Sequence, residues 1–272
     1  MKEEIEIVKH YYEENSESEW QRLEAHPFEF VFTTYMMDRY IKPGDTILDI
    51  GGGPGRYAIH YAKKGCDVTL LDLAKQNISI ALTKAKEAGV ALKTYVANCL
   101  DLDSLGLEKF DHVFLMGPLY HLLEETDRIK AVELALKHLK SGGNIYVSFI
   151  LGFAGIIYDL KNPGLIEQDY QNPLARQLIE AIKTQKNYEG DAFTKACFYH
   201  QKNILPFMER FPLRKLHLFG QEGIFSPNED SLLQRDETEI ALWIEIGKGF
   251  LELEELLSYS EHAMYIGKKT EY

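Results

Sequence analysis

Short apolar runs alternate with longer amphipathic stretches between Ile41 and Phe149. Apolar and β-branched runs of about four to eight residues that end at Gly, Pro or Asp are typical of strands, whereas apolar residues about every three or four positions are typical of helices. The alternation predicts strands joined by helices in a parallel sheet. The predicted strands of this region are Thr46–Ile50, Asp67–Leu71, Leu92–Val96, Phe110–Met116 and Asn144–Ile150.

Helical periodicity fills the gaps between these strands and continues outside them. Before the strands, Ile5–Leu23 predicts one or two amphipathic helices rich in aromatic residues. After them, the periodicity loosens, and two more strands are predicted at Arg214–Phe219 and Ala263–Ile266. The remaining predicted helices are Ala58–Lys64, Gln76–Ala88, Thr126–Lys140, Ala175–Lys183, Asn203–Arg210 and Glu237–Ser258.

Together these elements predict an α/β fold with a doubly wound, mostly parallel, seven-stranded sheet. We expect residues 1–40 to form an N-terminal helical cap and residues 41–272 to form the main domain. Two segments, at about 151–198 and 226–261, are predicted to be insertions that cover the carboxyl edge of the sheet as lids and form a ligand pocket. Ligands of open α/β sheets bind at that edge.

Composition and charge narrow the function classes. The chain is 45% hydrophobic and 26% charged, which is typical of a soluble globular protein. Thirty basic residues against forty-two acidic ones give a net charge of −12, which disfavours nucleic acid or an anionic membrane as partner. Three scattered cysteines and an acidic start predict a reduced, cytoplasmic protein. The histidines lack metal-ligand spacing, so we expect no metal site.

A cluster of glycines follows the first predicted strand, in Asp49-Ile50-Gly51-Gly52-Gly53-Pro54-Gly55-Arg56. Glycine lets the backbone approach a ligand closely and supplies N–H groups at a helix start. Asp72 ends the second strand, 21 residues after Gly51, where such folds hold a ribose through its hydroxyls. The pair predicts an adenosine-type ligand.

A nicotinamide cofactor is the alternative ligand. The dinucleotide pattern G-x-G-x-x-G fails when it starts at Gly51, because Arg56 stands where the third glycine belongs. A start at Gly53 puts Ala58 in that position, and alanine is sometimes tolerated there. An NAD(P)-dependent oxidoreductase therefore stays open, as does a tight turn without any ligand.

The segment Asp49–Gly55 resembles the first motif of class I S-adenosylmethionine-dependent methyltransferases, an acidic residue and one further residue followed by G-x-G-x-G. The resemblance covers about residues 41–150 and, more loosely, the closing strand. It implies a Rossmann-like methyltransferase fold, S-adenosyl-L-methionine as cofactor, and transfer of its methyl group to a small-molecule acceptor by in-line displacement. The acceptor atom, O, N, S or C, stays open, and so does a cofactor-binding protein without turnover.

By the same resemblance, the glycine turn lies against the methionine part of the cofactor, Asp72 holds the ribose, and Asn98 with Cys99 contacts adenine. Asn98 departs from the family's usual Asp, and a turn-forming role is its alternative. The N-terminal stretch looks like a family cap in which an Arg pairs with the methionine carboxylate. The implied cofactor-binding residues are Asp49, Gly51, Gly53, Gly55, Asp72, Leu73, Asn98, Cys99, Met116 and Arg22.

Met116-Gly117-Pro118-Leu119-Tyr120-His121-Leu122 resembles the G-P-L-Y-H-L segment of a bacterial subgroup that methylates small molecules. In that subgroup the segment lines the cofactor and the acceptor pocket, which makes Tyr120 and His121 the candidate catalytic residues. Imidazole is a useful general base near neutral pH, and a Tyr ring can cover a sulfonium. The alternative is that both side chains pack against the following helix. The N-P-P-Y motif of amino-methylating DNA enzymes is absent.

Two later segments, around Glu222 and His262, also look like parts of this subgroup. Both side chains can reach a pocket, but a surface carboxylate and a strand-end histidine are the more common outcomes. His200 is a weaker candidate of the same kind.

Overall fold

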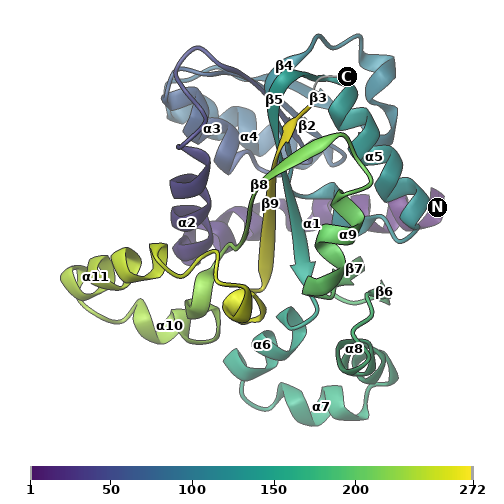
Figure 1. Cartoon of the computed structure of the whole chain (residues 1–272), viewed down its shortest axis with the longest axis vertical. Coiled ribbons are helices and arrows are strands. Elements are labelled where there is room, and N and C mark those ends of the chain that lie inside the picture. The colour runs from purple at the N-terminus through teal and green to yellow at the C-terminus, as the bar shows by residue number, and fades with distance from the viewer. Residues whose placement is uncertain (1, 271–272) are drawn as a thin grey trace.

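The computed structural model describes residues 2–270, and these form one nine-stranded sheet in a doubly wound α/β arrangement (Figure 1). Five parallel strands run in the order β3-β2-β1-β4-β5, and β9 then pairs antiparallel with β5 and with β8. The predicted α/β class and mostly parallel sheet are confirmed. The strands are β1 (Thr46–Ile50), β2 (Asp67–Asp72), β3 (Lys93–Val96), β4 (Phe110–Leu115), β5 (Leu139–Leu151), β6 (Tyr188–Asp191), β7 (Lys195–Tyr199), β8 (Leu213–Gly220) and β9 (His262–Lys269).

The central strands are buried on both faces because helices cover both sides of the sheet. Successive side chains of a strand point to opposite faces, so Val113 and Leu115 of β4 pack into one core and Phe114 into the other. The helices are α1 (Lys2–Ala25), α2 (Pro27–Met37), α3 (Arg56–Lys63), α4 (Lys75–Glu87), α5 (Glu125–Lys137), α6 (Ala154–Lys161), α7 (Leu165–Gln171), α8 (Pro173–Lys183), α9 (Ile204–Met208), α10 (Glu229–Leu232) and α11 (Glu237–Lys248).

The described residues also form five short 3₁₀ helices. Buried residues of α5 and α9 belong to one core, and buried residues of α2, α3 and α4 belong to the other. The 3₁₀ helices are η1 (Cys99–Leu105), η2 (Pro118–His121), η3 (Gln201–Asn203), η4 (Gly223–Asn228) and η5 (Glu254–Tyr259).

The sheet contains two strands beyond the seven that the sequence predicts. β6 and β7 pair antiparallel inside the segment 151–198, and β7 joins β5 in parallel at Ile150 and Leu151. The last pair between β4 and β5 is Leu115 with Val147, so β7 takes the side of β5 that β4 leaves free. β6 reads Tyr-Glu-Gly-Asp and has no apolar alternation, so its sequence alone does not predict a strand.

Two predicted helices are too long. Thr126–Lys140 is wrong at its end, because α5 stops at Lys137 and Leu139 already pairs with Phe110 of β4. Glu237–Ser258 is also wrong, because α11 stops at Lys248, beside Gly249, and Leu251 then enters the core. None of the helices within residues 2–270 combines the length and hydropathy needed to cross a bilayer.

Residues 1–40 hold two described helices with different surroundings. α1 is a single helix of 24 residues and lies along the surface of the sheet's carboxyl edge (Figure 1). α2, which the sequence did not predict as a separate element, buries Phe28, Phe32 and Met36 in the core. α2 is therefore part of the hydrophobic core, whereas α1 is available to cover a site.

Candidate functional site

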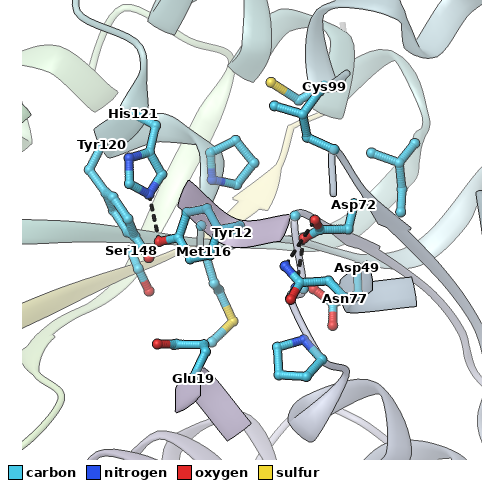
Figure 2. A pocket seen from close by; sticks show the side chains of 18 of the residues that line it. Tyr12, Glu19, Asp49, Asp72, Asn77, Cys99, Met116, Tyr120, His121 and Ser148 are labelled. Atoms are coloured by element: carbon cyan, nitrogen blue, oxygen red, sulfur yellow. Dashed lines mark hydrogen bonds between the residues drawn. The ribbon is translucent and has the colours of Figure 1, made fainter. Parts of the chain in front are cut away.

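A cavity opens at the carboxyl ends of β1, β2, β4 and β5, under one face of α1. Residues of α1 line it at helical spacing, including Ile5, Val8 and Tyr12. Figure 2 shows Asp49, Asp72 and Asn77 on one side of the cavity and Tyr120, His121 and Ser148 on the other. We call the first side the glycine end and the side that continues to His262 the far end.

The glycine end is shaped by two loops that touch. Gly51 has φ +68°, and a Cβ there would lie 2.4 Å from Cγ of Pro118. A Cβ on Gly117 would lie 2.5 Å from the carbonyl oxygen of Gly51. The loop after β1 and the loop after β4 therefore lie against each other without room for side chains.

The other two predicted glycines differ in position. Gly53 lines the cavity with φ +58°, and a Cβ there would meet no atom of the described chain within 4 Å. Gly55 is the N-cap of α3, and a Cβ on it would face Ala81 and Leu70 instead. Gly53 leaves open space for a ligand, whereas Gly55 lets α3 pack closely.

Asp72 ends β2 and is buried. Its carboxylate accepts hydrogen bonds from the backbone N–H of Gly53 (2.9 Å) and Ala74 (2.8 Å) and from Nδ2 of Asn77 (3.1 Å). Burial raises its pKa, and the three hydrogen bonds act in the opposite direction. These bonds fix the carboxylate beside the glycine loop.

The carboxyl group of Asp49 lies close to that of Asp72 but has fewer hydrogen bonds. Its Oδ2 is buried and accepts no hydrogen bond from any described residue. Burial, with the negative charge of Asp72, raises the pKa of Asp49 to about 7. A buried carboxylate oxygen without a partner is costly, and a hydrogen-bond donor on a ligand would relieve that cost.

The predicted adenine-contacting residues line the same cavity. Oδ1 of Asn98 accepts a hydrogen bond from the N–H of Leu100 (2.9 Å), so Asn98 also has the turn-forming role given as its alternative. Cys99 is buried, which raises the pKa of its thiol to about 12 and keeps it protonated. Leu73 and Met116 line the cavity as well.

His121 uses both ring nitrogens. Nδ1 lies 3.0 Å from the carbonyl oxygen of Lys195 in β7, so Nδ1 carries the proton and donates it. Nε2 then accepts a hydrogen bond of 2.9 Å from the hydroxyl of Tyr12 in α1. Burial lowers the pKa of His121 to about 4, so the ring is neutral. Tyr120 packs edge-on against it, with ring centroids 4.8 Å apart.

Two arginines line the cavity. Arg22 donates two hydrogen bonds to the carboxylate of Glu19, at 2.9 and 2.7 Å, within α1. Arg56, which the sequence analysis used only against a dinucleotide motif, also lines the cavity, and its Nη1 is buried without a hydrogen-bond partner in the described chain. Its guanidinium lies 4.3 Å from the ring centroid of Phe30. The position of Arg56 directly after the glycine turn was the available signal.

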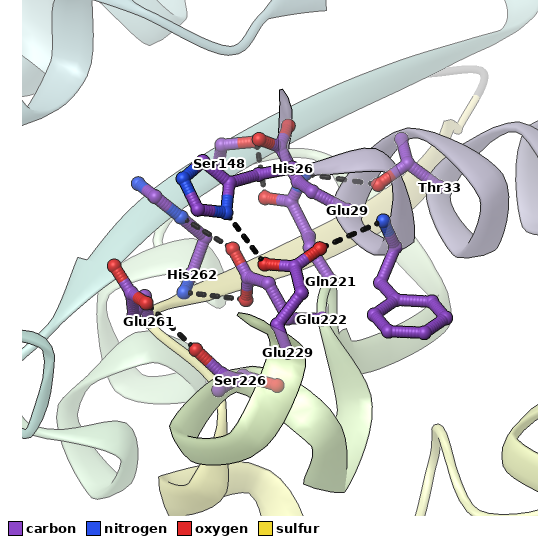
Figure 3. A network of polar contacts seen from close by, with 12 residues as sticks. His26, Glu29, Thr33, Ser148, Gln221, Glu222, Ser226, Glu229, Glu261 and His262 are labelled. Carbon is purple, nitrogen blue, oxygen red and sulfur yellow. Dashed lines mark hydrogen bonds and ion pairs between the residues drawn. The ribbon is translucent and has the colours of Figure 1, made fainter. Parts of the chain in front are cut away.

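The far end is built from side chains of α2, β5, β9 and the loop after β8. Ser148 donates to Gln221 (2.7 Å), and Gln221 donates to Thr33 (3.0 Å). Glu222 is not a surface carboxylate, because only 5% of it is exposed. It is bonded to His262, which lines the cavity (Figure 3).

Among residues 2–270, one group brings together three side chains of types that can bind a metal ion: Glu29, Glu222 and His262 have donor atoms within 4.8 Å of one another. Two of these are already engaged with each other, and Glu29 accepts a hydrogen bond of 2.9 Å from Tyr57. The absence of a metal stays a prediction.

Comparison with known proteins finds similarity in the region that contains the glycine end. Residues 47–143 match the model of a methyltransferase domain. The ubiquinone biosynthesis O-methyltransferase of Xanthomonas axonopodis pv. citri is 32% identical over 114 residues, 42% of this chain and 46% of that protein. The protein of the same name in Aliivibrio fischeri is 30% identical over 105 residues, 39% of this chain and 44% of that protein. The chain thus matches less than half the length of these relatives.

Solved structures resemble nearly the whole chain. A 1,6-didemethyltoxoflavin-N1-methyltransferase of Burkholderia thailandensis, with S-adenosylhomocysteine bound, has a TM-score of 0.61 at 12% identity and covers 97% of this chain and 88% of its own. The magnesium protoporphyrin IX methyltransferase of Synechocystis PCC 6803 has a TM-score of 0.60 at 13% identity. The match covers 98% of this chain and 100% of that protein's chain. The chain therefore has the Rossmann-like methyltransferase fold that the sequence predicted.

Proposed function

We propose that this chain is an S-adenosyl-L-methionine-dependent methyltransferase that acts on a small-molecule acceptor. One observation carries the proposal: Asp72, the unpartnered oxygen of Asp49 and the open space at Gly53 meet in one cavity. They do so within the region that matches a methyltransferase domain.

The residues of the glycine end fit the cofactor. Asp72 has lone pairs left to accept hydrogen bonds from ribose hydroxyls, and Asp49 offers its Oδ2 to a donor such as the methionine ammonium group. Leu73, Asn98 and Cys99 would contact adenine, and Gly51 and Gly53 would lie against the methionine part. Gly55 would act only by shaping the turn. When bound, the cofactor supplies a methyl group on a positively charged sulfur.

Two arginines compete for the methionine carboxylate. Arg22, the residue expected from the cap, would have to share or leave Glu19. Arg56 has a buried Nη1 without a partner in the described part of the chain. This N–H group is available to a ligand carboxylate, which makes Arg56 the second candidate. Arg22→Lys and Arg56→Lys should distinguish the two candidates. The variant of the arginine that binds the carboxylate should lose affinity for the cofactor, because a single ammonium cannot form the two-point contact.

We also propose that the Met116–Leu122 segment serves as it does in the bacterial subgroup it resembles. Met116 and Tyr120 line the cavity in which the sulfonium and the acceptor would meet. The contacts of His121 with Tyr12 and Lys195 favour a positioning role over that of a base, because neither nitrogen is free to take a proton. Residues 1–40 as a cap and 151–198 and 226–261 as lids belong to the same proposal.

The test is isothermal titration with S-adenosylmethionine, S-adenosylhomocysteine and NAD separately. We expect the two sulfur ligands to bind and NAD not to bind. In Asp72→Ala, affinity should fall by about 100-fold, since two hydrogen bonds to a charged group are lost. Asp67→Ala is the matched control, because Asp67 lies at the other end of β2, exposed and paired with Lys93 (2.9 Å).

Other outcomes would replace the proposal. Binding of NAD alone would favour an oxidoreductase. Binding of the sulfur ligands without methyl transfer to any acceptor would favour a cofactor-binding protein without turnover. We propose a cytoplasmic protein that uses neither nucleic acid nor a membrane as partner, and a gel-shift and a vesicle co-sedimentation assay should both give no binding.

A further inference from the structure

His262 and the buried Glu222 form a hydrogen-bonded pair at the far end of the cavity (Figure 3). Nδ1 of His262 lies 2.6 Å from Oε1 of Glu222, and the backbone N–H of His262 donates to Oε2 at 3.0 Å. One carboxylate thus holds both the ring and the main chain of the same residue. The ring has one orientation, with Nδ1–H directed at Glu222.

The other nitrogen of His262 is unengaged. No hydrogen bond between described residues involves Nε2, although the ring lines the cavity. Its centroid lies 6.4 Å from that of Tyr120. Ser148 lines the same cavity, and the register of β5 with β9 puts it on the same face of the sheet as His262.

This arrangement is the reverse of that at His121. His121 has a backbone carbonyl on one nitrogen and a hydroxyl on the other. His262 has a carboxylate on Nδ1 and open cavity at Nε2, so the neutral ring has a lone pair there that can accept a proton.

We propose that His262 is the catalytic base that removes the proton of a phenol-type hydroxyl acceptor, and that Glu222 is its positioning residue. This inference rests on the proposed methyltransferase function.

The step balances as follows. The acceptor oxygen forms a bond to the methyl carbon while the carbon–sulfur bond breaks and its electron pair stays on sulfur. The hydroxyl proton moves to Nε2 of His262 and later leaves to solvent. The imidazolium that forms is flanked by two carboxylates, Glu222 and Glu29. Both stabilise its positive charge.

The groups around His262 favour a phenol over other hydroxyls. Three carboxylates face it: Glu222 from the loop after β8, Glu29 from α2 and Glu261 from the residue just before β9. Tyr120 faces it from η2. The carboxylates outweigh burial and raise the pKa of His262 to about 9, so the neutral, proton-accepting ring is a minor form at neutral pH and becomes common as pH rises toward 9. This pKa is close to the value of about 10 for a phenol, so proton transfer from a phenol to the neutral ring is nearly balanced. Met116 and Tyr120 give an aromatic ring an apolar surround.

The experiment compares catechol with 4-nitrocatechol as acceptor probes at pH 8, with S-adenosylmethionine as donor. 4-Nitrocatechol is already ionised there and needs no base. In His262→Asn, kcat/KM for catechol should fall by about 100-fold or more, the typical effect of losing a general base. For 4-nitrocatechol the loss should stay below about fivefold. Affinity for S-adenosylhomocysteine should be unchanged.

Glu222→Gln tests the positioning role separately. For wild type with catechol, kcat/KM should rise with pH up to about 9, the pKa of His262. Without the carboxylate, the rising limb of this pH profile should level off at a lower pH, toward about 6.5, the ordinary pKa of His. A residue with only a structural role would lower the rate without moving the limb. Glu222→Asp should restore the wild-type limb in part.

Three results overturn the proposal. Equal losses on both probes in His262→Asn would make His262 a residue that only shapes the pocket. An unshifted pH profile in Glu222→Gln would show that the His262–Glu222 pair only shapes the pocket. This second test can still be made if His262→Asn fails to fold. Cofactor binding with methyl transfer to aniline but to neither catechol would leave the methyltransferase standing and remove the hydroxyl acceptor. Failure to bind either sulfur ligand would instead remove the proposed function itself.

Discussion

The two ends of the cavity are built in different ways. Asp49, Gly53 and Asp72 come from the β1–β2 region of the chain, and the glycine end consists mainly of backbone groups, the Asp72 carboxylate that they fix and the Asp49 carboxylate beside it. The far end brings together Glu29 and Ser148 with Glu222 and His262, from four distant segments. Side chains make most of the contacts there, together with the backbone N–H of His262.

This difference separates two kinds of recognition. A ligand part held by main-chain N–H groups and a tight turn is recognised through backbone shape, which depends on glycine. A ligand part held by side chains is recognised through their charge and proton content, which depends on pH. We therefore expect substitutions at the two ends to change different measured quantities.

Among the substitutions that compare the two ends here, the largest effect is expected at Gly53. In Gly53→Ala, the new Cβ projects into the open space of the cavity, and φ of +58° strains any residue with a Cβ. We expect affinity for S-adenosylhomocysteine to fall by about 30-fold, or about 2 kcal/mol, by isothermal titration.

Gly44→Ala is the control for Gly53→Ala. Gly44 has φ +92° and also has open space at its Cβ, but it lies outside the cavity lining. Both variants should lose about 1–2 kcal/mol of unfolding free energy, and only Gly53→Ala should lose affinity. Equal affinity in the two variants would show that the cofactor does not pass Gly53.

The next effect is a pH dependence of stability at the far end. The pKa of folded His262 is raised to about 9, chiefly by Glu222 against the effect of burial, while the unfolded value is about 6.5. The folded chain therefore binds more protons between these pH values. The stabilisation is complete below about pH 6.5 and is lost as pH rises through about 9.

Urea unfolding of wild type and Glu222→Gln at a series of pH values measures this. Wild-type stability should fall more steeply than that of the variant between pH 6.5 and 9, by up to about 1.4 kcal/mol per pH unit. Parallel curves would mean that Glu222 does not hold a proton on His262. Variants of the glycine end should leave the slope unchanged.

The smallest effect is expected where α1 covers both ends. Tyr12→Phe keeps the ring but removes the hydrogen bond to Nε2 of His121. A net loss of about 1 kcal/mol should weaken S-adenosylhomocysteine binding about fivefold and speed hydrogen exchange in α1. Tyr11→Phe is the control, because no described residue hydrogen-bonds the Tyr11 hydroxyl, while its ring packs on Phe193. Equal exchange in both variants would remove Tyr12 as the residue that holds α1.

The features that the sequence predicted are those determined by residues close together along the chain. β1 ends at the glycine turn and β2 ends at Asp72, so the pattern of strands alone brought the glycine end together. It did not predict β6, whose residues become a strand only by pairing with β7. It also did not predict that Glu222 is buried against His262, because this contact joins distant segments and is decided by long-range packing. Arg56 reaches the cavity from directly beside the glycine turn, so its position in the sequence was a usable signal.

The contact of Gly51 with Gly117 and Pro118 limits how this chain can be changed by laboratory evolution. A side chain at Gly51 meets Pro118, and a side chain at Gly117 meets the backbone of Gly51, so neither position accepts a single substitution without moving the other loop. Substitution of Glu29, Ser148 or His262 is not limited by a backbone contact of this kind. A library built to alter acceptor preference should therefore randomise the far end and leave the two touching loops intact.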